Sequence, residues 1–162
     1  MNKDLHRSKT HSVGSTLIEV LISIAIVVLV LVTMVASGTL VTKNRRFSAD
    51  QAVASKYGQE AIEWTKAMRN TVGWKTFYDT ISAKGNPVTL CLPTLPATAV
   101  EFDAKSAGAC LASDVITDTP YLRSIVFSVT SSSEIAAQST VSWTDNTADH
   151  QVTTTTVLQE WQ

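Results

Sequence analysis

The residues best suited to chemistry lie near the start of the chain, where Gly14, Ser15 and Glu19 come just before or at the start of a long apolar run. A carboxylate in hydrocarbon is costly, so a partner usually neutralises it. The run over residues 20–36 contains no lysine or arginine that could do so. Cleavage after Gly14 would create an α-amine on Ser15, about one helical turn from Glu19. Such an amine, on this chain or on a neighbouring one, is the natural counter-ion of Glu19.

This arrangement resembles the type IV prepilin signal, which has a short basic leader, a glycine at the cleavage site, a few apolar residues, a glutamate and a long apolar helix. The matching residues are Lys3, Arg7, Lys9, Gly14, Thr16, Leu17, Ile18 and Glu19. The match is specific because glycine, glutamate and apolar run must all fall in register. One departure is Ser15, since the family usually has phenylalanine at the first mature position. That position varies among minor pilins and pseudopilins.

The resemblance implies a minor pilin or pseudopilin, a structural subunit of a type IV pilus-like filament for secretion, DNA uptake, adhesion or motility. A prepilin peptidase would cut between Gly14 and Ser15, and Ser15 would become N-methylated. Glu19 would serve assembly by pairing with the amine of a neighbouring subunit. The other implied partners are further pilin or pseudopilin subunits and an inner-membrane assembly platform.

Two other interpretations of the N-terminal segment stay open. An ordinary secretory signal could be cut near residues 36–38, although its apolar centre is typically only about 7–15 residues long. The secretory signal would also give Glu19 no purpose. A plain single-span anchor is the second interpretation. The corresponding alternative function is a membrane-tethered surface binding module that does not polymerise. Recovery of the protein in sheared surface filaments would favour the filament subunit over this module.

The charge pattern excludes one class of partner and leaves the membrane orientation open. The chain has a net charge of −1 and 17% charged residues, so it gives no direct signal for nucleic-acid binding. Three basic residues lie on each side of the apolar run, namely Lys3, Arg7 and Lys9 before it and Lys43, Arg45 and Arg46 after it. The positive-inside rule therefore gives a tie. A cytoplasmic N-terminus and an extracytoplasmic C-terminal domain, carried into a pilus or pseudopilus at the surface or in the periplasm, follow from the resemblance.

The two cysteines, Cys91 and Cys110, both lie in the part that would be exported. In an oxidising compartment we expect them to form a disulfide. The alternative is two unpaired, buried thiols. A bridge closing this loop would stabilise the fold by roughly 3 kcal/mol on the loop-entropy estimate.

The inventory of side chains argues against an enzyme. Of the three histidines, His6 and His11 belong to the predicted leader, which leaves His150. No spacing suggests a Ser/His/Asp triad, and no glycine-rich phosphate loop is present. We therefore predict no catalytic residue and no cofactor.

One weak metal candidate remains near the C-terminus, where Asp145, Asn146 and Asp149 are close together. Clustered oxygen ligands can bind calcium, and some pseudopilins do so near their C-terminal strands. The favoured interpretation is an ordinary turn, in which Asp and Asn side chains bond to the backbone.

The elements that would position these residues predict an α+β fold of the pilin type. A leader over residues 1–14 is followed by a transmembrane and filament-core helix over 15–42 and its amphipathic continuation over 43–72. On that second half Phe47, Ala54, Ala61, Thr65 and Met68 recur at helical spacing. Residues 73–120, which hold all four prolines, are predicted to be an irregular, variable loop with a short strand just before Cys91.

Residues 121–162 predict an antiparallel sheet. Alternation over residues 123–130 and 137–144 and a Thr- and Val-rich run over 152–161 predict three strands joined by short turns. Ile125, Phe127 and Val129 fall on one side of the first strand, and Ser139, Val141 and Trp143 share one side of the second. One face of this meander must be buried, and the amphipathic helix is the available cover.

Overall fold

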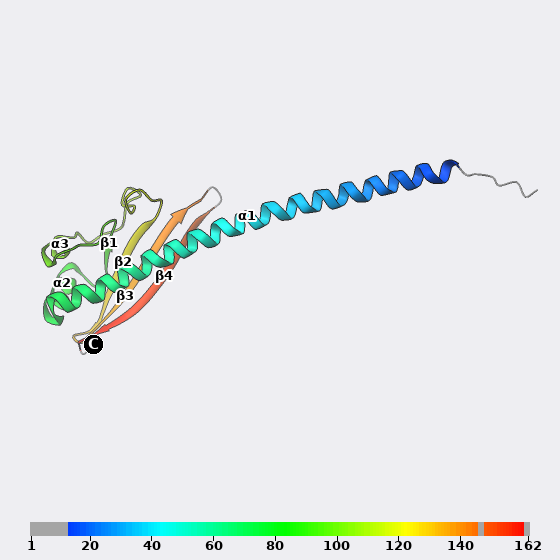
Figure 1. Cartoon of the computed structure of the whole chain (residues 1–162). Coiled ribbons are helices and arrows are strands. Elements are labelled where there is room, and N and C mark those ends of the chain that lie inside the picture. Colours follow the sequence, from blue (N-terminus) through cyan, green and yellow to red (C-terminus); the bar gives the residue numbers. More distant parts are fainter. Residues whose placement is uncertain (1–12, 146–147, 161–162) are drawn as a thin grey trace, which may run out of the picture. The chain divides into compact units, whose positions relative to one another are not determined.

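The computed structural model describes residues 13–145 and 148–160 and divides into two compact units, Met1–Arg46 and Phe47–Gln162. The second unit combines helices with a four-stranded antiparallel sheet, which confirms the α+β class (Figure 1). The basic residues of the predicted leader, Lys3, Arg7 and Lys9, lie outside the described residues.

The longest element is helix α1 (Val13–Val72), whose 60 residues belong partly to each unit. It runs without a break through the two segments expected to be helical, residues 15–42 and 43–72. Gly38 is helical, and Thr42 Oγ1 donates a hydrogen bond to its carbonyl oxygen at 3.0 Å. The helix stops at Gly73, whose φ of 82° lies in the left-handed region that glycine tolerates best. The Gly73 N–H donates to the carbonyl of Arg69 at 2.9 Å, as at many helix ends.

In the second unit, α1 buries one face of small side chains. Four of the five residues predicted to share this face are buried, namely Ala54, Ala61, Thr65 and Met68. Phe47, the fifth, is 42% exposed. At Gly58 α1 lies close to the sheet, because a Cβ there would lie 3.1 Å from Thr154 Oγ1. The missing side chain at Gly58 thus lets the helix rest directly on the sheet.

The sheet has the strand order β1-β2-β3-β4, with every neighbouring pair antiparallel (Figure 1). The strands are β1 (Val88–Cys91), β2 (Leu122–Ser131), β3 (Glu134–Thr144) and β4 (Asp149–Gln159). The predicted meander is confirmed as β2, β3 and β4, and the predicted short strand is β1. The predicted faces are confirmed as well: Val129 is half-buried against the core, and the other five residues are buried, namely Ile125, Phe127, Ser139, Val141 and Trp143. Trp161, at the end of the last predicted strand, lies outside the described residues.

The prediction of an irregular segment over residues 73–120 was wrong in part. It contains helix α2 (Trp74–Lys84) and the short helix α3 (Ala99–Asp103) as well as β1. Phe77 and Ile81, one turn apart on α2, are both fully buried. Their spacing is the local cause of the helix, because it places both side chains on one face.

The middle segment also supplies much of the core. The ring of Phe77 on α2 stacks on Phe102 of α3 at a centroid distance of 5.5 Å. Its other neighbour, Phe127 of β2, meets it edge-on at 5.8 Å. These three rings are fully buried, so α2 and α3 complete the hydrophobic core of the second unit.

Candidate functional site

The first candidate is the apolar part of α1. The segment Thr16–Gly38 is 23 residues long and apolar enough to cross a membrane, and none of it is buried within the protein. At 1.5 Å per residue it extends about 35 Å, which exceeds the roughly 30 Å thickness of a bilayer's hydrocarbon core. The expectation of a membrane-spanning helix is thus met in length and composition.

Most polar side chains within this segment are satisfied by the helix itself. The hydroxyls of Ser23, Thr33 and Ser37 donate to the carbonyl oxygens of Glu19, Val30 and Thr33, each at 2.8 Å. Such hydrogen bonds within one helix remove much of the cost of placing a hydroxyl in hydrocarbon.

Glu19 differs from these hydroxyl residues. Its side chain is exposed, and its carboxylate takes part in no hydrogen bond or ion pair with the residues that the structure describes. It lies on one helix face with apolar and small residues, at the spacing of successive turns. The residues of this face are Thr16, Glu19, Val20, Ser23, Ile24, Val27 and Val28. The structure thus presents an exposed acid on an apolar surface.

The predicted cleavage site lies in the first turn of α1, where the backbone of Gly14 and Ser15 is helical. Ser15 precedes Glu19 by four residues, a rise of about 6 Å along the helix axis. An amine created at Ser15 would therefore lie close to Glu19 of its own chain or of a chain packed alongside. Cleavage and N-methylation stay predictions.

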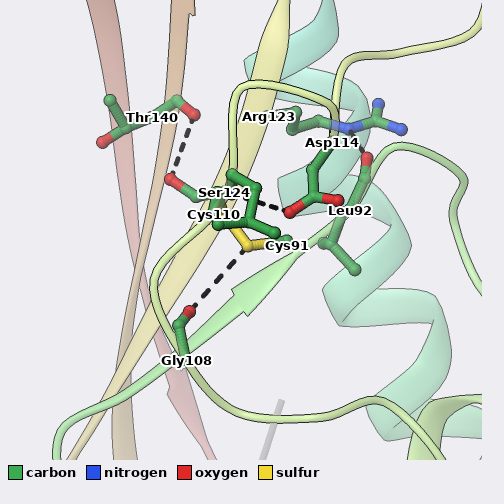
Figure 2. The surroundings of a disulfide bond; sticks show 9 residues. Cys91, Leu92, Gly108, Cys110, Asp114, Arg123, Ser124 and Thr140 are labelled. Atoms are coloured by element: carbon green, nitrogen blue, oxygen red, sulfur yellow. Dashed lines mark hydrogen bonds between the residues drawn. A yellow bond between two sulfur atoms is a disulfide. The ribbon is translucent and has the colours of Figure 1, made fainter.

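The second candidate feature is a disulfide, which confirms the predicted pairing. Cys91, at the end of β1, is bonded to Cys110, with their Cα atoms 5.4 Å apart (Figure 2). Next to it, the N–H of Gly108 donates to the carbonyl of Thr89 at 3.0 Å. The bridge and this hydrogen bond hold the loop before Cys110 against the outer edge of β1.

The acidic cluster near the C-terminus forms a hydrogen-bonded turn. Asp145 accepts a hydrogen bond from the backbone N–H three residues later at 2.9 Å, and its other oxygen lies 3.1 Å from Nε2 of His150. Asp149 accepts from the hydroxyl of Thr144 at 2.6 Å. Asn146, the third predicted ligand, lies outside the described residues. Within residues 13–145 and 148–160, no group of three or more His, Cys, Asp or Glu side chains is placed to hold a metal.

Sequence reasoning missed a buried charge that ties α1 to the sheet. Arg123 on β2 is 3% exposed, and its Nη1 donates to Oε2 of Glu60 on α1 at 2.8 Å. Its Nε donates to the carbonyl of Leu92 at 3.0 Å. Burial lowers the pKa of Arg123, and the hydrogen bond and charge of Glu60 oppose that shift. The sequence pattern could have indicated this burial, because Arg123 lies two residues before Ile125 and four before Phe127, on the same face of β2.

An aromatic cluster was also missed. The ring of Phe47 lies 5.1 Å from that of His150 and 6.4 Å from that of Trp143, and Trp143 lies 5.8 Å from Tyr121. The Tyr121 hydroxyl donates to Oδ1 of Asp50 at 3.1 Å. Burial, aided by this hydrogen bond, raises the pKa of Tyr121 to about 12. No sequence signal joins these residues, which come from α1 and three different parts of the sheet region.

Comparison of the chain with protein-family models, with curated proteins and with solved structures finds no match. The geometry itself therefore carries the functional argument. It consists of an exposed apolar helix bearing one carboxylate and a disulfide-closed α+β unit.

Proposed function

We propose that the protein is a structural subunit of a type IV pilus-like filament, a minor pilin or pseudopilin. The observation that carries this proposal is the difference in burial between the two parts of α1. Its segment Thr16–Gly38 exposes apolar side chains all round together with Glu19, while one face of its later part, which includes Ala54, Ala61 and Thr65, is buried within the second unit. This combination supports the prepilin resemblance of the residues around Gly14.

An apolar helix with no cover of its own needs either lipid or other apolar helices around it. In the proposed cycle lipid surrounds Thr16–Gly38 first, and the same segments of neighbouring subunits replace the lipid in the filament. Glu19 then meets the Ser15 amine of a neighbour in a medium of low polarity, where an ion pair is much stronger than in water. That pairing sets the axial register of the fibre.

The second unit would face outward from this helical core. Its disulfide supports the proposal, because such bonds persist in oxidising compartments outside the cytoplasm. The proposed work is mechanical: the subunit primes, extends or decorates a fibre.

Processing at Gly14 is the direct test. Mass spectrometry of the purified protein should find Ser15 at the N-terminus, heavier by one methyl group. Gly14→Ala should leave the uncut precursor in the membrane, whereas Gly38→Ala, a matched glycine within the same helix, should be processed normally. Cleavage near residues 36–38 would instead support an ordinary secretory signal, and an uncut wild-type chain would support a plain anchor.

Recovery tests assembly separately from processing. The proposal predicts that sheared filaments contain this subunit together with other pilin-like chains. A mature protein found solely in the membrane as a monomer would contradict it and favour a tethered binding module.

A further inference from the structure

The two edges of the sheet differ in whether another segment of the chain covers them. Strand β1, at one edge, is four residues long and is covered by the loop that the disulfide holds in place. Within that loop, Ala107 pairs with Leu90 of β1 and Gly108 donates to Thr89. Strand β4, at the other edge, is 11 residues long and pairs with β3 alone (Figure 1).

The register shows which backbone groups of β4 face outward. Glu160 N–H donates to the Ser133 carbonyl, and Asp145 N–H donates to that of Ala148, so both pairs are hydrogen-bonded positions of the β3–β4 ladder. Hydrogen-bonded and open positions alternate along an antiparallel pair. The open positions, whose N–H and C=O groups point away from β3, are therefore Gln151, Thr153, Thr155 and Val157. Within the described chain these groups enter no hydrogen bond.

The open row ends where α1 reaches it. At Gln159, the next outward position, the carbonyl accepts a hydrogen bond from Arg69 Nη1 at 3.1 Å. The stretch from Gln151 to Val157 therefore offers roughly 20 Å of free edge. The side chains of the four outward residues are exposed, and those of Val152, Thr154 and Thr156 on the helix side are half-buried.

Natural sheets usually protect an exposed edge with lysine, proline, a bulge or a covering segment. Residues 149–159 contain no lysine, arginine or proline, and β4 pairs with β3 through 11 consecutive positions without a register shift. Thr and Val, which favour extended backbone, fill its centre. The edge is thus long, regular and unprotected.

We propose that β4 is a docking edge for an extended segment of a partner protein, added as a fifth strand, with an uncharged centre and Lys or Arg at its ends. Charge complementarity selects this occupant. The centre of β4 is neutral, while Asp149 lies at one end and Glu160 and Glu134 lie at the other. The inference is independent of the proposed filament.

A second copy of the chain fits the edge less well. Antiparallel pairing of two β4 strands joins their outward positions, so over their full length Asp149 of one copy would lie opposite Gln159 of the other, next to that copy's Glu160. Acidic residues of both copies would then gather at each end of the pair, which is unfavourable. Strand addition uses main-chain hydrogen bonds for affinity and alternate side chains for specificity. A basic-ended segment would form those hydrogen bonds and place its positive charges near the acidic ends of β4.

The test uses the full-length protein in detergent micelles and a synthetic peptide with the sequence Lys-Lys-Thr-Val-Thr-Val-Thr-Lys-Lys. Binding should slow hydrogen exchange at the amides of Thr153, Thr155 and Val157. Thr155→Pro should weaken binding by about tenfold or more, because proline removes an outward N–H and leaves the β3–β4 ladder intact. Thr155→Val, which keeps the N–H, should bind as the wild type does.

If the Thr155→Pro protein does not fold, a second variant still tests the proposal. Asp149→Asn combined with Glu160→Gln should weaken binding several-fold and flatten its salt dependence. Equal binding of a peptide with glutamates in place of its lysines would overturn the charge argument. Absence of binding at about 1 mM peptide would overturn the docking edge. Self-association of the protein that Thr155→Pro abolishes would make a second copy the occupant and overturn the proposed partner.

Discussion

The two halves of α1 differ in how far the chain itself buries their side chains. In the first half, Leu17, Val27 and Val35 are 65%, 56% and 70% exposed. In the second half, Ala54 and Ala61 are fully buried against the chain's own sheet. One continuous helix therefore carries a face that the chain covers itself and a surface that it leaves uncovered.

This difference separates two sources of stability. The second unit gains its fold from contacts within the chain, so its mutations should alter the free energy of unfolding. In the proposed function, the segment Thr16–Gly38 gains stability from lipid or from neighbouring helices, so its mutations should alter insertion and assembly. A substitution in Thr16–Gly38 that lowered the free energy of unfolding of the second unit would contradict this separation.

The largest effect inside the second unit should follow loss of the disulfide. Replacing Cys91 and Cys110 by serine should lower the free energy of unfolding by about 3 kcal/mol, because the unfolded chain regains the freedom of the open loop. Denaturant unfolding of the protein in detergent measures this loss. Membrane insertion should be unchanged, and its failure would show that the two halves depend on each other.

Two glycines of α1 sharpen the comparison. Gly58→Leu should lower the free energy of unfolding of the second unit by about 1–3 kcal/mol, because its side chain would collide with Thr154. At Gly38 a Cβ would meet nothing within 4 Å, so Gly38→Leu should leave that free energy unchanged. Equal destabilisation by both substitutions, seen in thermal melts, would contradict the division.

Two glutamates of the buried half provide the next test. Glu60→Ala should cost about 1–3 kcal/mol, because it leaves the buried charge of Arg123 without a carboxylate. Glu63→Ala removes an exposed pair with Lys66 and should cost less than about 1 kcal/mol. Urea unfolding of the two variants compares them directly, and a reversed order would refute the role given to Arg123.

The smallest effect concerns alkaline pH. The fold raises the pKa of Tyr121 from 10.0 to about 12, so it favours the neutral phenol. This contribution to stability is fully present below pH 10 and is lost as the pH rises through 12. Ultraviolet titration of the phenolate should show a component near 12 that Tyr121→Phe removes. Persistence of that component in the variant would assign it to another tyrosine.

Local patterns in the sequence predicted much of this fold. Period-two alternation placed β2 and β3, and uniform apolarity marked the first half of α1, because each pattern reports the surroundings of one element. Strand β4 was placed by its Thr- and Val-rich composition. Helix α2 was missed because the surrounding glycines and prolines suggested an irregular segment. Its buried pair, Phe77 and Ile81, is a signal too short to stand out in such surroundings.

Among the candidate sites, too, some features could be predicted from the local sequence and others could not. The disulfide was predictable, because two cysteines in a region expected to be exported usually pair, whereas the role of Glu19 stays a prediction. The pairing of Arg123 with Glu60 and the open edge of β4 were not, since both depend on strand order and register. Phe47 was placed on the buried face by spacing, yet it is 42% exposed because it lies at the start of the second unit.

The central claim is that Glu19 acts between subunits, and incorporation of its variants into filaments tests it most directly. Glu19→Val should still insert and be cut after Gly14, because the cleavage site and the apolar segment are unchanged. It should be strongly depleted when partner subunits are pulled down, since an amine left unpaired in a buried setting typically costs about 3–5 kcal/mol. Glu19→Asp should be intermediate because it keeps the charge with a shorter reach. Normal incorporation of Glu19→Val would contradict the account.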